Sequence, residues 1–490
     1  MSKKKKSVIA PNDEHIEKYI SELNEDQVKA FYMMRDFLYL KDSRQMFLLK
    51  GFAGTGKTFT ISRLIQYAKD NEKHFCGYYN LEVALTAPTN KAVQVLRESS
   101  IPELKKHVNF KTVHQLLGLK ENITDSGEIE FRASFDEVKM IQSMQIVVID
   151  EVSMLQDELF YEIKNYCKEV KIIMMGDPAQ IPPVGKEDCE PFLHPEQHDI
   201  TEFSLNHIMR QKEGSQIIDL SMHIRNNEYN DEERIVHENG FDLTIAAAST
   251  KRPEITEFIK EKYSSASCKQ DSSYVKVIAW TNKKIKEYNT FIRNNYMRTH
   301  FPSYQEPYDR ILTGDKMITN APVLKKMQDS KYKGQDKIVL TTNQEFEVIN
   351  VTDQDGEFTC ADISVNLRFY LMEIKFYDVE TETYITDGIK TIHETSEGAF
   401  LKTLENCKNS ALHCPPNKKG YFWKEYYKFL RYFADVSYAY AITVHKAQGS
   451  TYLNTIVDAN NIMLNRNIRE RNRILYTAVT RAKNHLLIIN

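Results

Sequence analysis

The residues best suited to chemistry are grouped in one short stretch, RQMFLLKGFAGTGKT, which runs from Arg44 to Thr58. An apolar run typical of a buried strand, Met46 to Leu49, is followed by Gly51, Gly54 and Gly56 and then by residues with helical periodicity. Glycines let backbone N–H groups converge on phosphate oxygens, and the helix that follows points the positive end of its dipole at the same place. The pattern predicts a phosphate-binding loop.

Two side chains at the end of this loop would complete a nucleotide site. Lys57 would neutralise the β- and γ-phosphates, and the Thr58 hydroxyl would ligate Mg²⁺. Thr55, between the last two glycines, is assigned to the same site. The spacing matches the full P-loop pattern with a strand before it and a helix after it, which disfavours a plain glycine-rich turn. We therefore expect ATP and Mg²⁺ as cofactors.

Two adjacent carboxylates, Asp150 and Glu151, follow the apolar run QIVVI. Such carboxylates at the end of a buried strand are costly unless they bind something. We expect Asp150 to hold the Mg²⁺ shell and Glu151 to polarise the water that attacks the γ-phosphate. The next apolar run ends in GDPAQ, where Gln180 is expected to sense the γ-phosphate.

These residues must be held by a parallel sheet. Successive strands with intervening helices, carrying the P-loop and the acidic pair, predict a RecA-like domain. A second set of strands and helices begins near Val275 and closes at the C-terminus without a second P-loop. We expect an α/β fold of two RecA-like domains with one ATP in the cleft between them.

Two insertions are expected in this frame. The weakly patterned stretch 118–137, with Gly127 near its middle, predicts a small hairpin. Short alternating runs from about Ile311 to Asp435 predict an inserted β-barrel, taken as SH3-like. It ends in the aromatic segment Tyr421 to Phe433, for which helix packing is favoured over stacking on bases.

The expected boundaries follow from these patterns. Before the P-loop, Leu23 to Leu40 predicts a helix with Asn24 as its N-cap. The parts expected are a polar tail at 1–22, a first RecA-like domain at 23–203 with its hairpin at about 115–140, a second RecA-like domain in two parts at 204–310 and 436–490, and the inserted module at 311–435.

The composition of the chain indicates its cellular compartment more clearly than its function. The net charge of −3 and pI of about 6.6 mean that any nucleic-acid contact would come from a local groove and not from a basic body. The 7 cysteines include no CxxC pair, which favours a reduced intracellular setting without structural zinc. The sequence has no run of about 18 apolar residues and no signal-peptide pattern. We expect a cytosolic protein with no membrane contact.

Together the motifs resemble helicase superfamily 1, in its 5′-to-3′ branch of RecD-like and phage Dda-like enzymes. The resemblance covers nearly the whole chain from about Leu23. The motifs that carry it are Gln27 before the P-loop, GxAGTGKT at Gly51 to Thr58, the APTxxAA-like stretch Ala87 to Ala92, TxH at Thr112 to His114, DEVSM at Asp150 to Met154, GDxxQxxPV at Gly176 to Val184, Arg210 in LNHIMRQ, Trp280 to Asn282 as an FTN-like strand end, TVHKAQGST at Thr443 to Thr451, and LYTAVTRA at Leu475 to Ala482.

The resemblance implies roles for residues outside the P-loop. Arg210 and Arg481 would be arginine fingers that reach the γ-phosphate from the second domain when the cleft closes. Gln27 would pair with the adenine edge, and Gly449 would lie at the nucleotide. The residues expected to contact single-stranded DNA are Pro88, Thr89, Asn90, Thr112, His114, Thr281, Asn282, Thr443, His445 and Gln448. Trp280, Asn90 and Lys91 depart from the family pattern and make contacts there less secure.

The activity implied is an ATP-dependent DNA helicase that translocates 5′ to 3′ on single-stranded DNA and opens fork DNA, with a role in replication, recombination or repair. It would work as a monomer in a bacterial or phage-infected cell, with replication or single-strand-binding proteins as further partners. Phe131 or Phe135 in the hairpin would be the strand-separating wedge. The alternative is a translocase that displaces bound proteins without unwinding. The sequence has neither the NKxD motif of a GTPase nor the LSGGQ motif of an ABC-type ATPase.

Overall fold

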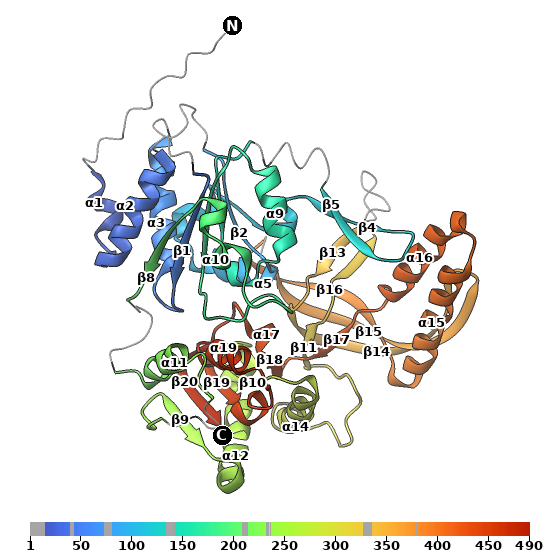
Figure 1. The fold of residues 1–490 in the computed structure, drawn as a ribbon. Helices are drawn as coiled ribbons and strands as arrows, with labels where there is room; N and C mark the ends of the chain where they lie inside the picture. Colours follow the sequence, from blue (N-terminus) through green and yellow to red (C-terminus); the bar gives the residue numbers. More distant parts are fainter. Residues whose placement is uncertain are drawn as a thin grey trace.

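The computed structural model describes residues 15–39, 44–72, 81–133, 141, 143–207, 214–231, 235, 237–326, 336–378 and 381–490. It contains two parallel sheets, each covered by helices on both faces, and a third, antiparallel sheet that extends to one side (Figure 1). The expected α/β architecture with two RecA-like domains is confirmed. None of the helices within the described ranges is long and apolar enough to cross a bilayer.

The first domain is built on a sheet whose order explains the apolar runs of the sequence. Its strands, in order across the sheet, are β3 (Asn109–Thr112), β2 (Val83–Ala87), β6 (Ile146–Ile149), β7 (Lys171–Gly176), β1 (Met46–Gly51) and β8 (Ile200–Leu205). Alternate side chains of β1 enter different cores, with Phe47 on one face and Leu48 on the other. Burial on both faces is why this strand is continuously apolar and not alternating.

The helices of the first domain enclose this sheet. They are α1 (Glu17–Ile20), α2 (Glu25–Tyr39), α3 (Lys57–Asp70), α5 (Asn90–Ser99), α6 (Pro102–Lys105), α7 (Val113–Leu116), α9 (Asp157–Tyr166) and α10 (Glu190–Leu193), with short 3₁₀ helices η2 (Val152–Met154) and η3 (Glu196–His198). The predicted helix before the P-loop is present as α2. Asn24 and Gln27 form a reciprocal capping box at its start, as each side-chain oxygen accepts the other residue's backbone N–H at 2.9 and 3.0 Å.

The second domain repeats the parallel design with the order β18-β10-β19-β20-β9. Its strands are β9 (Leu243–Ala246), β10 (Val275–Ala279), β18 (Ala441–Thr443), β19 (Tyr452–Asp458) and β20 (Ala482–Ile489). Its helices are α11 (Gln216–Asn226), α12 (Ala248–Ser264), α13 (Ala266–Gln270), α14 (Asn282–His300), α17 (Val444–Ala447), α18 (Ala459–Ile462) and α19 (Ile468–Val479).

The inserted module differs from the expected SH3-like barrel. Its antiparallel sheet has the order β16-β15-β14-β11-β17, and its edge strands β16 and β17 do not pair with each other in the described part of the chain. Two strands of 16 residues extend well beyond β11 and form an arm covered by two helices, so the sheet stays open. The elements are β11 (Lys316–Thr319), β14 (Glu345–Cys360), β15 (Ile363–Asp378), β16 (Thr383–Ile392), β17 (Val436–Tyr438), the separate pair β12 (Val323–Lys326) and β13 (Asp336–Leu340), η4 (Glu394–Ser396), α15 (Glu397–His413) and α16 (Pro416–Leu430).

Two expected boundaries divide a sheet, one within a strand and one directly before a strand. β8 belongs to the first sheet and ends at Leu205, so a boundary after residue 203 would cut it. β17 pairs with β11, so the inserted sheet extends past residue 435 to Tyr438. In both places a short strand joins a partner that is distant in sequence, which local patterning does not reveal.

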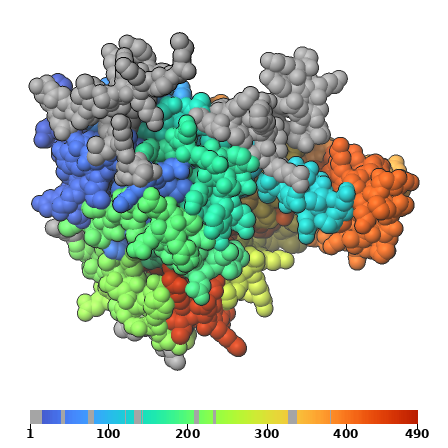
Figure 2. Space-filling model, turned by 45° about the horizontal axis from the view of Figure 1, so that its top comes forward, coloured from blue at the N-terminus to red at the C-terminus, as the bar shows by residue number. Residues whose placement is uncertain are grey.

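The predicted hairpin is present as β4 (Leu119–Ile123) and β5 (Ile129–Ala133), which pair antiparallel. It lies against α16 of the inserted module, and Figure 2 shows the cyan hairpin in contact with the orange arm. The aromatic segment forms most of α16, where Trp423 and Phe429 are buried. The preference for packing over base stacking is therefore correct for these two side chains.

Candidate functional site

The P-loop joins β1 to α3 with the geometry that its glycines require. Gly54 and Gly56 have φ angles of 84° and 78°, in the left-handed region that L side chains rarely adopt. A Cβ atom on Gly56 would lie 2.4 Å from the Nε2 atom of Gln27. Both backbone conformation and close packing therefore demand glycine at this position.

Lys57 and Thr58 lie in the first turn of α3, at the end of the loop. The Lys57 ammonium donates to the carbonyl oxygens of Gly51 at 2.8 Å and Phe52 at 3.0 Å. The hydroxyl of buried Thr55 donates to the same Phe52 carbonyl at 3.0 Å. A phosphate group in the loop would compete with these carbonyls for the ammonium, because an anion is a stronger acceptor.

Asp150 and Glu151 follow β6, which β7 alone separates from the P-loop strand. Burial and the neighbouring Glu151 carboxylate raise the pKa of Asp150, while the Lys57 ammonium opposes the increase. The strand order and this electrostatic interaction together place the Lys57 ammonium near the Asp150 carboxylate. Oxygen donors from Thr58 and Asp150 fit the preference of Mg²⁺ for hard ligands.

Glu151 has an unusual backbone conformation for a residue with a side chain. Its φ is 50°, and its N–H donates to the Asp150 carboxylate at 2.8 Å. A left-handed conformation at a residue other than glycine costs on the order of 1 to 3 kcal/mol, and such strain clusters at functional sites. The conformation agrees with the role expected for Glu151.

The Gln27 amide holds the P-loop in place. Its Nε2 donates to the Thr55 carbonyl at 2.9 Å, and its Oε1 accepts the Asn24 N–H at 3.0 Å, so both ends of the amide are engaged within the protein. The side chain is 2 % exposed. The adenine contact of Gln27 stays a prediction, and the structure adds a role in supporting the loop.

Gln27→Ala is expected to raise the KM for ATP about fivefold, and the KM for GTP by the same factor. The reason is that the variant loses one buried hydrogen bond to the loop, worth about 1 kcal/mol, and no contact to the base. Steady-state ATPase and GTPase assays would measure both constants. Gln94→Ala is the matched control, because Gln94 makes its hydrogen bond with Glu98 at the surface. An increase in the KM for ATP without an increase in the KM for GTP would indicate that Gln27 contacts adenine.

The segment from Asp177 to Ile181, at the end of β7, connects the two domains. The Gln448 amide of the second domain lies 3.4 Å from the Ser153 hydroxyl, 3.5 Å from the Gln180 side chain and 3.3 Å from the Ile181 carbonyl. Gln448 is buried, and its expected contact with DNA stays a prediction. Gln180 points to this interface, where it is placed to connect the second domain to the acidic pair.

Gly449 continues this interface. It has a φ of 76°, and a Cβ atom on it would lie 3.5 Å from the Cβ of Ala92 in α5. The backbone of the second domain therefore comes close to α5 of the first domain. The expected nucleotide contact of Gly449 stays a prediction.

Arg481 does not extend toward the P-loop. Its guanidinium donates to the carbonyl oxygens of Thr477 at 2.9 Å and Ser450 at 3.2 Å and to the Thr480 hydroxyl at 2.9 Å. All three acceptors belong to its own domain. A finger role would require these bonds to be exchanged for phosphate contacts. The other expected finger, Arg210, lies outside the described residues.

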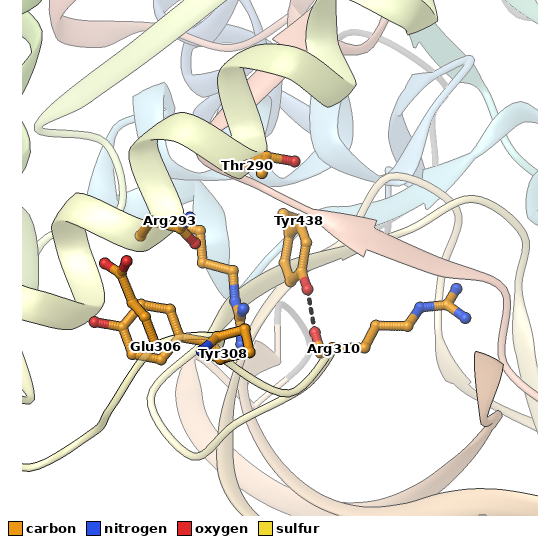
Figure 3. Close-up of a pocket in the computed structure, with 8 residues that line it drawn as sticks. Thr290, Arg293, Glu306, Tyr308, Arg310 and Tyr438 are labelled. Atoms are coloured by element: carbon orange, nitrogen blue, oxygen red, sulfur yellow. Dashed lines mark hydrogen bonds between the residues drawn. The ribbon is translucent and has the colours of Figure 1, made fainter. Parts of the chain in front are cut away.

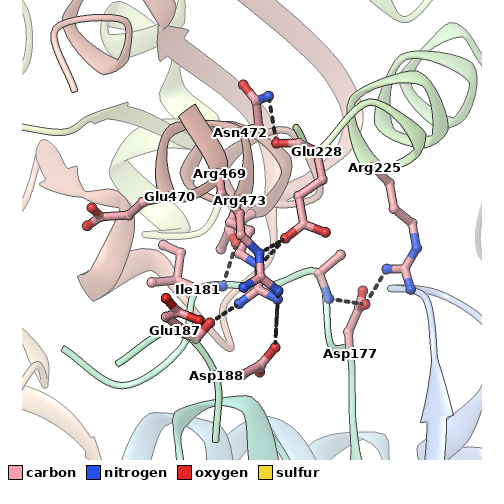
Figure 4. Close-up of polar contacts among 12 residues, drawn as sticks. Asp177, Ile181, Glu187, Asp188, Arg225, Glu228, Arg469, Glu470, Asn472 and Arg473 are labelled. Atoms are coloured by element: carbon pink, nitrogen blue, oxygen red, sulfur yellow. Dashed lines mark hydrogen bonds and ion pairs between the residues drawn. The ribbon is translucent and has the colours of Figure 1, made fainter. Parts of the chain in front are cut away.

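An arginine that the sequence analysis missed does reach the P-loop. Arg225, at the end of α11, pairs with Asp177 (Figure 4). Its guanidinium carbon lies 4.2 Å from the ring centroid of Phe52. No motif pointed to it, since an arginine at the end of an amphipathic helix is common. Only the arrangement of the two domains brings it to the loop.

The threonines expected to contact DNA have a shared structural role. Each is the N-cap of a helix at the carboxyl end of a parallel strand, and its hydroxyl accepts a backbone N–H of the first turn. The four are Thr89 for α5, Thr112 for α7, Thr281 for α14 and Thr443 for α17. β2 lies beside β3 and β10 beside β18, so each domain presents a neighbouring pair of caps.

The remaining residues of the expected DNA surface lie next to these caps. Asn90 and Asn282 open α5 and α14, and Pro88 precedes the cap of α5. Burial lowers the pKa of His114 and of His445, so both imidazoles are neutral at pH 7 and would act through hydrogen bonds or stacking. A positive charge for phosphate binding must come from elsewhere.

Phe131 of the hairpin lies beside His114. Their ring centroids are 5.3 Å apart in an edge-to-face arrangement, and Phe131 is 48 % exposed. The structure therefore brings one wedge candidate next to one candidate for DNA contact. Phe135, the other wedge candidate, lies outside the described residues.

The hairpin tip is anchored to α16. A Cβ atom on Gly127, whose φ is 85°, would lie 2.3 Å from the Trp423 ring. The Tyr427 hydroxyl donates to the Gly127 carbonyl at 2.8 Å, and Arg431 pairs with Glu121 at 2.5 Å. A hairpin fixed at its tip and along one strand can resist a sideways load.

A cavity of about 530 Å³ lies away from the P-loop, between α14 and the inserted sheet (Figure 3). Its central arginine, Arg293, is already neutralised by the Asp315 carboxylate at 2.8 and 2.9 Å. The Tyr438 hydroxyl donates to the Arg310 carbonyl. Because these groups are paired within the protein, the cavity is best explained as packing space at the junction with the inserted module.

Comparison with known proteins adds independent information. A family described as AAA domain matches residues 22–242, and a family described as UvrD-like helicase C-terminal domain matches residues 438–489. The first range contains the P-loop and the acidic pair, and the second contains α17 and α19. The two matched ranges therefore lie in the first and in the second parallel-sheet domain.

Relatives that match over nearly the whole chain have a low sequence identity to it. An uncharacterised protein R530 of Acanthamoeba polyphaga mimivirus is 27% identical over 91% of this chain and 95% of its own length. The ATP-dependent DNA helicase dda of Enterobacteria phage T4 is 25% identical over 94% of this chain and 98% of its own. Among solved structures, the Pif1 helicase of Candida albicans aligns over 96% of this chain and 95% of that chain, with 15% identity and a TM-score of 0.47.

Proposed function

We propose that the chain is a member of helicase superfamily 1, in the group that contains Dda, RecD and Pif1, and that it is an ATP-dependent DNA helicase that moves 5′ to 3′ on single-stranded DNA. The observation that carries the proposal is the meeting of Lys57, Asp150 and Glu151 at one edge of a sheet whose neighbouring strand end, Asp177 to Ile181, is held by the second domain. Hydrolysis at the first domain can therefore be transmitted to the second.

The chemistry assigns separate roles to the residues of this edge. Lys57 and the loop N–H groups would hold the phosphates, and Thr58 with Asp150 would hold Mg²⁺, which would neutralise charge on the phosphates when bound. Glu151 would orient and polarise the attacking water. Arg481 and Arg210 remain proposed fingers from the second domain.

The DNA surface is proposed to run over the capped helices of both domains. Because α5 and Gly449 are in contact, a change in the interface alters the distance between the caps of α5 and α17. If this distance decreased and increased in turn, a DNA strand bound at both caps would be moved. We propose single-stranded and forked DNA as substrates, the monomer as the working form, and replication or single-strand-binding proteins as partners.

ATP hydrolysis is expected to increase at least tenfold when single-stranded DNA is added, and the stimulation is expected to weaken steeply between 50 and 200 mM salt, because phosphate contacts release counterions. An ATPase assay across salt concentrations, with single-stranded DNA and with blunt duplex, measures both effects. The blunt duplex is the control and should stimulate poorly. Equal stimulation by both DNAs would contradict a single-strand track.

A further inference from the structure

Arg225 is the point at which the second domain contacts the P-loop. Its helix, α11, packs in the core of the second domain through Leu220 and Ile224. Its guanidinium nevertheless lies 4.2 Å from the ring centroid of Phe52, the residue after Gly51. A guanidinium over an aromatic face at this distance is a favourable cation–π contact, which strengthens when water is excluded.

The partner that fixes Arg225 also belongs to the first domain. Asp177 is fully buried, and it accepts hydrogen bonds from Arg225, from the Tyr476 hydroxyl at 2.6 Å and from the Ala179 N–H at 3.1 Å. A buried carboxylate without such partners would be costly. Two of its three partners come from the second domain, so Asp177 is satisfied only when the domains are together.

Tyr476 adds a second link to the loop. Burial and the Asp177 carboxylate raise the pKa of Tyr476, and the Ala53 backbone N–H opposes this increase, so Ala53 faces the hydroxyl that donates to Asp177. The ring of Tyr476 lies 5.7 Å from the Arg225 guanidinium. Consecutive P-loop residues, Phe52 and Ala53, are therefore each contacted by a different helix of the second domain.

Two arginines of α19, Arg469 and Arg473, make ion pairs at the interface with other residues than those of the P-loop. Arg473 pairs with Asp188 at 2.7 Å and with Glu228 at 2.7 Å, and Arg469 pairs with the same two carboxylates at 3.7 and 2.7 Å (Figure 4). These arginines hold the domains together from α19. Arg225 differs because its contact with Phe52 lies on the segment that would wrap the phosphates.

The Phe52 carbonyl is also bound by the Lys57 ammonium. A phosphate that drew Lys57 away would release this carbonyl, while Arg225 holds the ring of the same residue. We infer that Arg225 is a positioning residue for ATP hydrolysis, which transmits the state of the P-loop to the second domain through Phe52 and Asp177. The inference rests on the proposed function and deepens it.

The test compares Arg225→Gln with Arg469→Gln as the matched control. With saturating single-stranded DNA, R225Q is expected to lower kcat about tenfold or more and to change the KM for ATP less than about threefold, whereas R469Q changes both less than about twofold. Rates are normalised to nucleotide sites titrated with a fluorescent ATP analogue, so that loss of folded protein does not count. R225K should recover only part of kcat, because lysine lacks the planar fork.

A double-mutant cycle with Phe52→Leu separates coupling from general damage. F52L is expected to lower kcat about threefold, and R225Q/F52L should be no slower than R225Q alone, since both variants remove the same contact. Additive losses of kcat in the cycle would overturn the positioning role of Arg225. Equal effects of R225Q and R469Q would do the same, provided that DNA stimulates the ATPase of the parent protein, and neither outcome would contradict the proposed function. A parent without DNA-stimulated ATPase would instead contradict the proposed function.

Discussion

Glu151→Gln is expected to lower kcat for ATP hydrolysis by about 10³-fold while leaving MgATP binding nearly unchanged. The amide keeps the shape of the side chain but cannot take a proton from the attacking water. Glutamine can also retain the backbone conformation at φ 50°, because the Asp150 carboxylate still accepts its N–H. The loss should therefore appear in the chemical step and not in affinity.

The measurement pairs a fluorescent-nucleotide titration with an ATPase assay at saturating single-stranded DNA. Lys57→Ala provides the contrast, since it should weaken binding itself by removing the ammonium that faces the phosphates. Glu158→Gln, an exposed acid in the first turn of α9, is the control for loss of a carboxylate. A parental rate in Glu151→Gln would show that another group acts as the base.

Phe131→Ala is expected to reduce unwinding of a duplex with a 5′ single-stranded tail by about tenfold or more, with ATPase within about twofold of the parent. Opening one base-pair step costs on average about 1.4 kcal/mol of stacking, so strand separation needs a rigid element at the fork. The hairpin provides rigidity through Gly127, Trp423 and Tyr427. Its exposed Phe131 ring, next to His114, is placed to stack on the last pair.

Stopped-flow unwinding of 5′-tailed and 3′-tailed duplexes measures the effect and the polarity together. Deleting residues 125–127 at the hairpin tip should give the same separation of activities, and Tyr384→Ala, an exposed aromatic of β16, is the control. Efficient opening of the 3′-tailed duplex would reverse the polarity. Loss of ATPase in Phe131→Ala would make the hairpin structural. A parent that displaces streptavidin but opens neither duplex would favour the translocase.

The parts of the site that the sequence could predict are those made by neighbouring residues. The P-loop needs only a strand, a glycine turn and a helix in succession, and the acidic pair needs only the strand before it. The capping box of Asn24 and Gln27 is also local. The role of Gln27 is not local, because its amide meets a carbonyl 28 positions along the chain.

Other features of the site depend on contacts between segments that are distant in sequence. Gln448 and Gly449 lie in motifs that the sequence shows clearly, but their contacts with Ile181 and with α5 exist only where the two domains meet. The open arm in place of a barrel depends on strand length and pairing partners, and alternation of apolar residues does not report either. A pattern assigns a residue to a strand or helix without assigning its neighbours in space.

By itself, the sequence predicted the α/β class, a phosphate-binding loop and the resemblance to helicase superfamily 1, because these depend on contiguous residues and on short-range backbone geometry. Only the tertiary structure decided which side chains reach the P-loop from the second domain. Arg225 and Tyr476 lie more than 170 residues from Phe52 along the chain. In the fold both contact the buried Asp177, and Arg225 also contacts Phe52. Buried charges must find partners wherever the fold places them, and that requirement is satisfied in space and not in sequence.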